Sequence, residues 1–312
     1  MLKKEQLSVL IPVYNDTCTT LVKQICEVAL ATEWLEYEVI VADDGSTDMS
    51  KVAANECINM LPGCRYVKRN VNVGRAAIRN FLASEARFEW LLFLDCDVVI
   101  ISRTFIANYF KVAYNNMVIC GGLAIGGDDA ALKSNLRYIY EKAAEKRQTA
   151  ACRNRMPCQS FRTTNFFINR GTMLDHPFNE GIKTYGYEDV LFGKELQDSG
   201  ITVFHIDNQV EYTEYEDNAA YLKKTEEAMH TLHNLKSELE SFSSLVATQT
   251  KVQALHLSGM MDVIFRIFEK HWRKCLLSQH PSVAVYNAYR LFYFNRLCRR
   301  LVTNLSSGEN LV

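Results

Sequence analysis

Trp90-Leu91-Leu92-Phe93-Leu94 is a run of five apolar residues, and Asp95-Cys96-Asp97 follows it directly. A short continuous apolar run is typical of a strand that is buried on both faces of a parallel sheet. Such a strand has no solvent in which to place two carboxylates, so we expect Asp95 and Asp97 to lie beyond its end. Carboxylates two residues apart in a turn can converge on one Mg²⁺ or Mn²⁺ ion. Taken alone, the pair is more typical of a solvated turn, so its meaning depends on its surroundings.

Strand and helix patterns alternate on the N-terminal side of this run. They predict strands at residues 7–13, 38–42, 65–68 and 90–94, and helices at residues 18–31, 48–60 and 74–86. Strands that alternate with helices indicate an α/β fold in which helices flank a mostly parallel sheet. In such sheets, ligands bind in the crevice beyond the carboxyl ends of the strands.

Polar residues stand at three of these strand ends, which predicts a binding site there. They are Tyr14-Asn15-Asp16, Asp43-Asp44 and Asp95-Cys96-Asp97. The carboxylate of Asp43 is suited to accept hydrogen bonds from a nucleobase or a ribose. The alternative is structural, because Asp44-Gly45 is an ordinary turn pair and Ser46 or Thr47 suits the cap of the next helix. One loop can serve both purposes.

Two further motifs place charges at helix starts. Arg75 and Arg79 stand four residues apart, on one helix face, where they suit either a nucleotide or a strand-end aspartate. Glu188 and Asp189 open a later helix. Acidic residues in a first turn favour the helix dipole, and a carboxylate there can also serve as a general base toward an acceptor hydroxyl. The residues themselves leave these alternatives open.

The composition, net charge and cysteine spacing of the chain argue against several classes of protein. The chain has 312 residues, of which 48% are hydrophobic and 23% charged, and its formal net charge is −1. This charge leaves no basic excess for a nucleic-acid partner. The ten cysteines form no C-x-x-C pair, which argues against a zinc site. No apolar run reaches the length of a membrane span and no secretory signal is visible, so we expect a cytoplasmic protein.

From residue 216 onward the sequence is expected to be almost entirely helical, because apolar residues keep helical spacing. These helices carry cations at Arg266, Lys270, Arg273, Lys274, Arg290, Arg296, Arg299 and Arg300. Basic helices with aromatic residues suit peripheral contact with the inner face of a membrane. The apolar stripe itself is expected to pack on the rest of the protein or on a second copy in a homodimer.

Five motifs follow one another in a set order and spacing. They are Ile11-Pro12-Val13-Tyr14-Asn15, Asp43-Asp44-Gly45-Ser46-Thr47-Asp48, Asn72-Val73-Gly74 with Ala77-Ile78-Arg79-Asn80, Phe93-Leu94-Asp95-Cys96-Asp97, and Gly186-Tyr187-Glu188-Asp189. Together they resemble glycosyltransferase family 2, over about residues 6–212. The resemblance implies a GT-A fold and an inverting transfer of a hexose-type sugar from a nucleotide-sugar donor, a UDP-sugar or similar, to an acceptor hydroxyl. Such reactions belong to polysaccharide or glycoconjugate biosynthesis.

The resemblance also implies a division of the chain and a set of roles. We expect a catalytic domain at residues 1–215, with a nucleotide-binding half (1–100) and an acceptor half (101–215), then a helical region (216–312). The implied nucleotide-sugar-binding residues are Pro12, Tyr14, Asn15, Asp43, Asp44, Arg79, Asp95 and Asn165. Of these, Pro12, Tyr14 and Asp43 are expected to contact the nucleobase, and Asn165 is expected to line the sugar pocket.

The catalytic and metal residues are implied in the same way. Asp189 corresponds to the catalytic base, and Glu188 to a residue that binds the acceptor or the donor sugar. Asp97 corresponds to a direct ligand of Mg²⁺ or Mn²⁺, and Asp95 contacts the metal or the ribose. Relatives often supply a histidine as a further ligand, but Tyr212 stands roughly where it is expected. His205 in the preceding strand is an alternative ligand, although a lone strand histidine is more often structural.

Two other functions compete with this interpretation. A non-catalytic subunit that binds a sugar or a lipid carrier, or that serves in assembly, could keep the fold without the chemistry, and the missing histidine favours it. A sugar nucleotidyltransferase shares the α/β layout, but it needs a glycine-rich basic loop that residues 11–15 lack. A dinucleotide-dependent oxidoreductase is disfavoured because no G-x-G-x-x-G follows the first strand. The expected partners are therefore a nucleotide-sugar donor and a glycan or lipid-linked acceptor.

Overall fold

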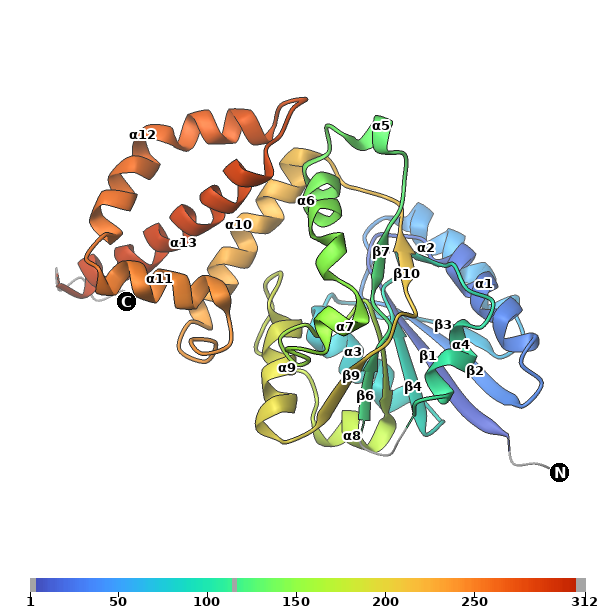
Figure 1. Ribbon diagram of the computed structural model, residues 1–312. Helices are drawn as coiled ribbons and strands as arrows, with labels where there is room; N and C mark the ends of the chain where they lie inside the picture. Colours follow the sequence, from blue (N-terminus) through green and yellow to red (C-terminus); the bar gives the residue numbers. More distant parts are fainter. Residues whose placement is uncertain (1–3, 114–116, 307–312) are drawn as a thin grey trace. The chain divides into compact units, whose positions relative to one another are not determined.

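The computed structural model describes residues 4–113 and 117–306 of the chain (Figure 1). Two units can be distinguished within it. The first consists of Met1–Gly127, Ala144–Lys183 and Glu188–Glu214, and the second of Asp128–Ala143, Thr184–Tyr187 and Tyr215–Val312. The sequence pattern did not predict that residues 128–143 and 184–187 belong with the C-terminal part.

A seven-stranded sheet forms the centre of the first unit. Its strands are β1 (Glu5–Val13), β2 (Leu35–Asp43), β3 (Cys64–Lys68), β4 (Trp90–Leu94), β6 (Met117–Cys120), β8 (Asn165–Asn169) and β9 (Thr202–His205). Their order is β3-β2-β1-β4-β8-β6-β9, and neighbours are parallel except where β8 pairs with β4 and β6. A second sheet has the order β5-β10-β7, from Val98–Ile100, Val210–Tyr212 and Leu123–Ile125. The predicted α/β fold with a mostly parallel sheet is confirmed.

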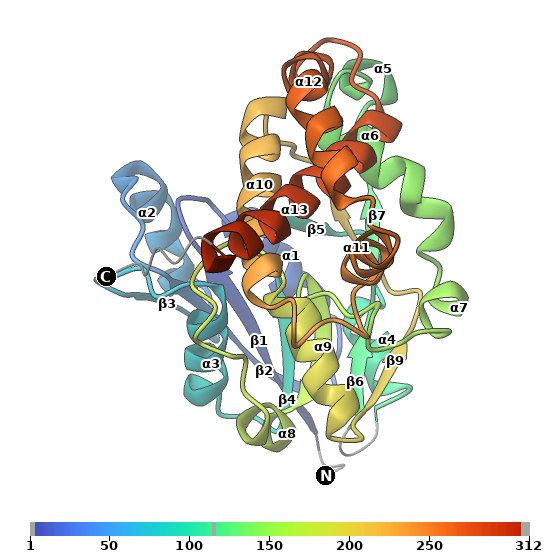
Figure 2. The ribbon, with the colours of Figure 1, turned by 90° about the vertical axis from the view of Figure 1, so that its left-hand side faces the viewer.

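Helices cover both faces of the seven-stranded sheet (Figure 1, Figure 2). One face carries α1 (Thr19–Leu30), α2 (Met49–Glu56) and α4 (Phe105–Phe110), and the other carries α3 (Arg75–Glu85), α8 (Arg170–Asp175) and α9 (Glu188–Asp198). Shorter helices are η1 (Cys57–Met60), η2 (Glu145–Arg147) and α7 (Ala150–Arg153). Two consecutive rings of β8 divide between the faces: Phe166 packs on Phe192 of α9, and Phe167 on Tyr109 of α4.

Strand β4 lies in the interior, as its sequence predicts. All of its side chains are buried, and Phe93 stacks on Phe166 of β8 with ring centroids 4.7 Å apart. Each large apolar side chain buried in this way contributes roughly 1.5–3 kcal/mol. Because β1 and β8 hold β4 on both edges, the point at which the chain leaves the sheet at Asp95 is fixed.

The strand ends that carry the polar clusters meet at one edge of the sheet. Val13 at the end of β1 pairs with Asp43 at the end of β2, and Leu10 pairs with Phe93 near the end of β4. Because these strands are parallel, the segments that follow them leave the sheet on the same side. The register thus brings the three clusters of the sequence together.

The second unit is helical. Its helices are α5 (Asp129–Leu132), α6 (Leu136–Ala144), α10 (Asn218–Asn234), α11 (Ser244–Ala254), α12 (Ser258–Leu276) and α13 (Val283–Ser306). Its core consists of the buried side chains Leu136, Leu222, Phe265, Leu276, Tyr286 and Tyr289. In the described ranges, no helix is both long and apolar enough to cross a membrane. The predicted C-terminal helices are therefore present, although the side chain of Arg300 lies outside the described residues.

Candidate active site

Asn15 ties the loop after β1 to the loop after β2. Its backbone φ is 51°, in the left-handed region that asparagine tolerates better than most residues. Its Oδ1 accepts hydrogen bonds from the backbone N–H of Thr47 at 2.8 Å and of Asp48 at 2.9 Å, and its own N–H donates to Ser46 Oγ at 2.7 Å. The cap of α2 is Asp48, in place of the expected Ser46 or Thr47, because the helix begins at Met49. Asn15 therefore shapes the loop beside the expected nucleotide.

Asp43 ends β2 as a carboxylate that is only 2% exposed. It accepts a hydrogen bond from the backbone N–H of Ser46 at 2.7 Å and another from the hydroxyl of Tyr66 on β3. Each carboxylate oxygen can accept more than one hydrogen bond. These contacts therefore orient Asp43 and leave it acceptor capacity.

Asp44 anchors the start of α3 to the end of β2. Its two oxygens accept hydrogen bonds from the backbone N–H groups of Val73 and Gly74, each at 2.9 Å. Burial raises the pKa of Asp44 above its ordinary value. Gly45 follows with φ of +74°, and a Cβ there would lie 2.6 Å from the backbone nitrogen of Asn72. Glycine is required at this point because the two loops approach so closely.

Pro12 and Tyr14 lie at the end of β1. Pro12 is half-buried within the strand, whereas the side chain of Tyr14 is 47% exposed just beyond it. An aromatic ring that stays in solvent at the ligand-binding edge of a parallel sheet is suited to stack on a base. Of the residues expected at the base, Tyr14 is the one most open to a ligand.

An ionic cluster connects the end of β4 with the start of α9. Arg79 is 2% exposed, and its Nη2 lies 2.7 Å from Asp95 Oδ1. Its Nη1 lies 3.9 Å from Glu188 Oε1, and Arg75 Nη1 lies 3.4 Å from the same oxygen. Two motifs that are about ninety residues apart in sequence therefore share one pair of arginines.

Asp95 and Asp97 have different surroundings in the turn after β4. Burial acts to raise the pKa of Asp95, but the charges of Arg79 and Arg75 outweigh it and hold this pKa below its usual range. Asp97 is half-buried. The thiol between them, Cys96, has a pKa raised by burial and then by the charges of Asp97 and Asp16. Negative charge is thus concentrated at this turn.

The donor atoms at this turn fit a divalent cation that is bound together with a phosphate ligand. Within residues 4–113 and 117–306, no group of three or more His, Cys, Asp or Glu side chains could hold a metal ion. Mg²⁺ commonly takes one or two carboxylates from a protein and completes its shell with phosphate oxygens and water. The carboxylates of Asp95 and Asp97 match that pattern.

Asp189 lies in the first turn of α9, next to Glu188. Its Oδ1 accepts a hydrogen bond from the backbone N–H of Val190 at 2.8 Å. Burial, and then the charge of Glu188, raises the pKa of Asp189 to about 6. A carboxylate with this pKa is ionised near neutral pH and still basic enough to take a proton from a hydroxyl in a transition state.

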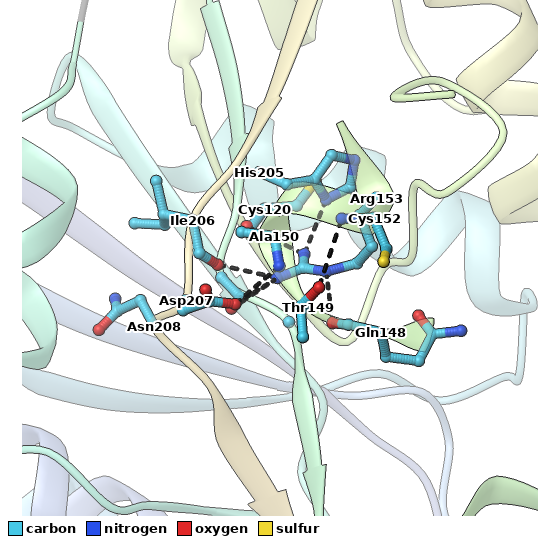
Figure 3. Close-up of polar contacts among 12 residues, drawn as sticks. Cys120, Gln148, Thr149, Ala150, Cys152, Arg153, His205, Ile206, Asp207 and Asn208 are labelled. Carbon is cyan, nitrogen blue, oxygen red and sulfur yellow. Dashed lines mark hydrogen bonds and ion pairs between the residues drawn. The ribbon is translucent and has the colours of Figure 1, made fainter. Parts of the chain in front are cut away.

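His205 is 1% exposed in β9, where its ring lies beside Arg153 (Figure 3). Nδ1 lies 2.7 Å from Arg153 Nη1, and Nε2 lies 2.9 Å from the carbonyl oxygen of Pro157. Burial lowers the pKa of His205 to about 4, so the ring is neutral and accepts from the guanidinium. We therefore assign His205 to the support of Arg153 and leave it out of the metal site.

Asn165, which was expected to line the sugar pocket, is held by contacts within the protein. It is 3% exposed, and its amide nitrogen donates to the carbonyl oxygens of Gly122 and Asn208, each at 3.0 Å. Its Oδ1 accepts a hydrogen bond from the hydroxyl of Tyr109. These contacts connect β8 with α4 and with the turns that contain Gly122 and Asn208, so we propose that Asn165 has a structural role.

Arg75 and Tyr66 also contact the predicted site residues, although neither was among the residues predicted to bind the nucleotide sugar. Arg75 joins Arg79 at Glu188, and its four-residue spacing from Arg79 was the available signal. Tyr66 reaches Asp43 across the β2–β3 pairing, for which the sequence offers no local signal. A groove of about 630 Å³ lies along the other face of α3, between residues such as Arg69, Asn80 and Lys183, and contains none of the predicted site residues.

Arg79→Ala is expected to lower the free energy of unfolding by about 3–5 kcal/mol, because it leaves Asp95 and Glu188 without the buried cation between them. Urea denaturation measures the change. Arg65→Ala is the matched control, since the Arg65–Glu85 pair is 39% and 37% exposed and should contribute no more than about 1 kcal/mol. Equal losses in the two variants would contradict the assigned role of Arg79.

Comparisons with known proteins identify the family of this chain. A family model described as glycosyl transferase family 2 matches residues 8–176, which is more than half of the chain. An uncharacterised glycosyltransferase of Haemophilus influenzae is 28% identical over 121 residues, covering 36% of this chain and 48% of that protein. Chondroitin synthase of Escherichia coli is 32% identical over 93 residues, covering 30% of this chain and 13% of that protein. The matches thus span about half of the first relative and about an eighth of the second.

A solved structure shares the fold. It is a mannosyltransferase from Pyrobaculum calidifontis in complex with GDP-Man and Mn²⁺, with a TM-score of 0.56 and 14% sequence identity. The alignment covers 98% of this chain and 88% of that chain. At this identity the likeness concerns the GT-A fold alone.

Proposed function

The chain belongs to glycosyl transferase family 2, and we propose that it is an inverting, metal-dependent enzyme that transfers a hexose-type sugar from a nucleotide-sugar donor to an acceptor hydroxyl. The observation that carries this proposal is the ionic cluster of Arg75, Arg79, Asp95 and Glu188. Through Arg79 it links Asp95, after β4, to Glu188 at the start of α9, next to the proposed base Asp189. The residues proposed to bind the donor and the residue proposed to take the proton thus lie close together.

The nucleotide half of the donor is proposed to lie over the ends of β1 and β2. Tyr14 supplies the exposed ring there, and Asp43 supplies a carboxylate that Ser46 and Tyr66 orient. An acceptor carboxylate suits the imide N–H of a uracil, so we propose a UDP-sugar as the donor. Asp44 supports this arrangement by fixing the loop that begins α3.

Asp95 and Asp97 are proposed to hold Mg²⁺ or Mn²⁺ together with the diphosphate of the donor. A cation bound there neutralises the charge that develops on the departing diphosphate. Arg79 keeps Asp95 ionised and oriented toward this turn. Arg75, whose side chain is 51% exposed, adds positive charge on the same side of the site.

Asp189 is proposed to take the proton from the acceptor hydroxyl. As that proton leaves, the hydroxyl oxygen forms a bond to the anomeric carbon, and the bond from that carbon to the diphosphate oxygen breaks. A single displacement of this kind inverts the anomeric configuration. Glu188 is held by the two arginines and sits next to the base, so we propose that it positions the acceptor or the donor sugar.

Tyr14→Ala is expected to weaken donor binding by roughly 5- to 150-fold, since stacking of an aromatic ring on a base contributes about 1–3 kcal/mol. Tyr14→Phe keeps the ring and should bind the donor nearly as well as the unchanged protein. Isothermal titration of the nucleoside diphosphate measures both variants. Because the side chain is 47% exposed, thermal unfolding should be unaffected. If Tyr14→Ala bound the nucleoside diphosphate with full affinity, the nucleobase would not stack on Tyr14.

A panel of nucleotide sugars tests the activity itself. Each is incubated with the protein and Mn²⁺, with and without candidate glycan and lipid-linked acceptors, and release of nucleoside diphosphate is measured. We expect release from one or a few UDP-sugars, loss of it with chelator, and a product of inverted anomeric configuration by NMR. Binding of a nucleotide sugar without any release or transfer would instead favour the non-catalytic alternative.

A further inference from the structure

Helix α12 exposes a row of large apolar side chains to solvent. They are Met260, Val263, Ile267 and Phe268, with exposed fractions of 56%, 54%, 67% and 46%, together with Leu257, which caps the helix and is 39% exposed. Met260, Val263 and Ile267 follow one another at spacings of three and four residues, which places them along one side of the helix, and Leu257 and Phe268 border this side. We call this side the outer face of α12. Single exposed apolar residues are ordinary on protein surfaces, but a continuous row marks an interaction site.

The opposite side of α12 already has its packing partners. Met261, Phe265 and Leu276 are buried, and Phe265 and Leu276 belong to the core of the helical unit. Phe268 is 46% exposed and Ile264 is half-buried, so neither is fully enclosed by this core. The helix is therefore apolar on two sides, and only one of them serves the core.

The charges of α12 are sorted between its two sides. Lys270 and Lys274 are exposed, and the side chain of Arg266 is 68% exposed while its guanidinium lies 2.8 Å from Asp262. The two carboxylates of the helix lie toward α13: Asp262 is 5% exposed, and Glu269 lies 2.9 Å from Arg296. Of the α12 charges, those left in solvent are therefore cationic.

We propose that the outer face of α12 lies on the surface of an anionic phospholipid bilayer. An amphipathic helix in this orientation sinks its apolar side chains to the headgroup boundary, and its flanking lysines and arginines contact anionic headgroups. The nineteen residues of α12 span about 28 Å, enough for several turns to lie along the surface. The exposed row and the flanking cations thus match the two components of a membrane surface.

A second copy of the chain fits this face less well than a bilayer. In a two-fold dimer the same patch meets itself, so Arg266, Lys270 and Lys274 would face their own counterparts. Asp262 already pairs with Arg266, and Glu269 pairs with Arg296 of α13, so neither carboxylate of α12 is left to neutralise the two lysines of a second copy. A bilayer with anionic headgroups supplies the complementary charge.

Vesicle co-sedimentation of the full chain tests this proposal. The protein is mixed with vesicles of phosphatidylcholine alone, or of phosphatidylcholine with phosphatidylglycerol, at low and high salt. We expect binding to the anionic vesicles that weakens as salt rises. Val263→Glu with Ile267→Glu should abolish it. Lys270→Glu with Lys274→Glu should weaken it by at least roughly 30-fold, because each lost cation contributes about fivefold and each new carboxylate is repelled by the anionic surface.

Matched controls distinguish the effect of substitutions in the outer face from the effect of similar substitutions elsewhere on the surface. Met60→Glu removes an 80% exposed apolar side chain elsewhere, and Lys23→Glu reverses an exposed charge on α1. Both should bind anionic vesicles like the unchanged protein. Circular dichroism checks that all variants are folded, which is expected because the altered side chains are exposed.

Three results would overturn the proposal. The first is that the unchanged protein does not bind anionic vesicles. The second is that Val263→Glu with Ile267→Glu binds them as well as the unchanged protein. The third is that the unchanged protein binds no vesicles but forms a dimer in sedimentation equilibrium, and that Val263→Glu with Ile267→Glu alone among the variants is monomeric. The last would assign the face to a second copy. The proposal does not rest on glycosyl transfer, because the vesicle assay contains neither donor nor acceptor.

Discussion

Asp97→Asn is expected to lower kcat/KM for the nucleotide-sugar donor by about a thousandfold. A bound cation contributes several kcal/mol of transition-state stabilisation, and each 1.4 kcal/mol corresponds to about tenfold in rate. The substitution keeps the size of the side chain and removes the charge that we propose holds the cation. Nucleoside diphosphate release under saturating Mn²⁺ measures the loss.

Asp175→Asn is the control for this variant. Asp175 is an exposed residue at the end of α8, so the control makes the same chemical change away from the site. Activity near that of the unchanged protein is expected. Asp97→Asn should also keep its thermal stability, because its side chain is half-buried at a strand end. An active Asp97→Asn enzyme would remove the cation from the proposed mechanism.

Asp189→Asn is expected to reduce kcat by about 10²- to 10⁴-fold while donor affinity stays the same, because general base catalysis contributes a factor of this size. Asn keeps the hydrogen bond from the Val190 N–H and cannot accept a proton. The control is Asp198→Asn, which changes an exposed residue at the far end of the same helix. If Asp189→Asn lost donor affinity and kept kcat, Asp189 would be a binding residue.

The pH dependence offers a second test of Asp189. Its pKa is raised to about 6 by burial and by Glu188, so the ionised base is the minor form below that pH. We expect kcat/KM to rise about tenfold per pH unit up to around pH 6 and then to level off. This limb should disappear in Asp189→Asn. A profile that is flat through pH 6 in the unchanged protein would contradict the assignment.

The same pKa predicts a stability effect of the opposite kind. Because the folded state binds the proton of Asp189 more tightly than the unfolded chain does, the resulting stabilisation is present at low pH and is lost as pH rises through about 6. At neutral pH the ionised side chain of Asp189 therefore destabilises the folded state. Asp189→Asn should unfold at the same temperature as the unchanged protein or a higher one.

The strand pattern predicted the sheet because its signals are local. The apolar run of β4 and the polar residues after β1, β2 and β4 can be read along the chain, and parallel pairing brings the strand ends together without further information. The position of α6 could not be read in this way. Leu136 is part of the core of the helical unit, and that packing depends on residues from more than eighty positions later in the chain.

The contacts of single polar residues were harder to predict than the strand ends near which they lie. Asn165 and His205 are polar residues on strands near the predicted site, yet their partners Tyr109, Gly122 and Arg153 come from distant elements. Sequence spacing carries no signal for such contacts. The common position of Arg75 and Arg79 on α3 was easier to predict, because a four-residue spacing puts two residues on one side of a helix.

The central claim is that Asp95 and Asp97 bind a cation together with the diphosphate of the donor. Isothermal titration of Mn²⁺ into the protein, first alone and then with saturating UDP, tests it most directly. We expect weak binding of Mn²⁺ alone, much tighter binding with UDP beyond the affinity of UDP itself for Mn²⁺, and loss of this gain in Asp97→Asn. Tight Mn²⁺ binding without nucleotide, or a gain that survives Asp97→Asn, would contradict the account.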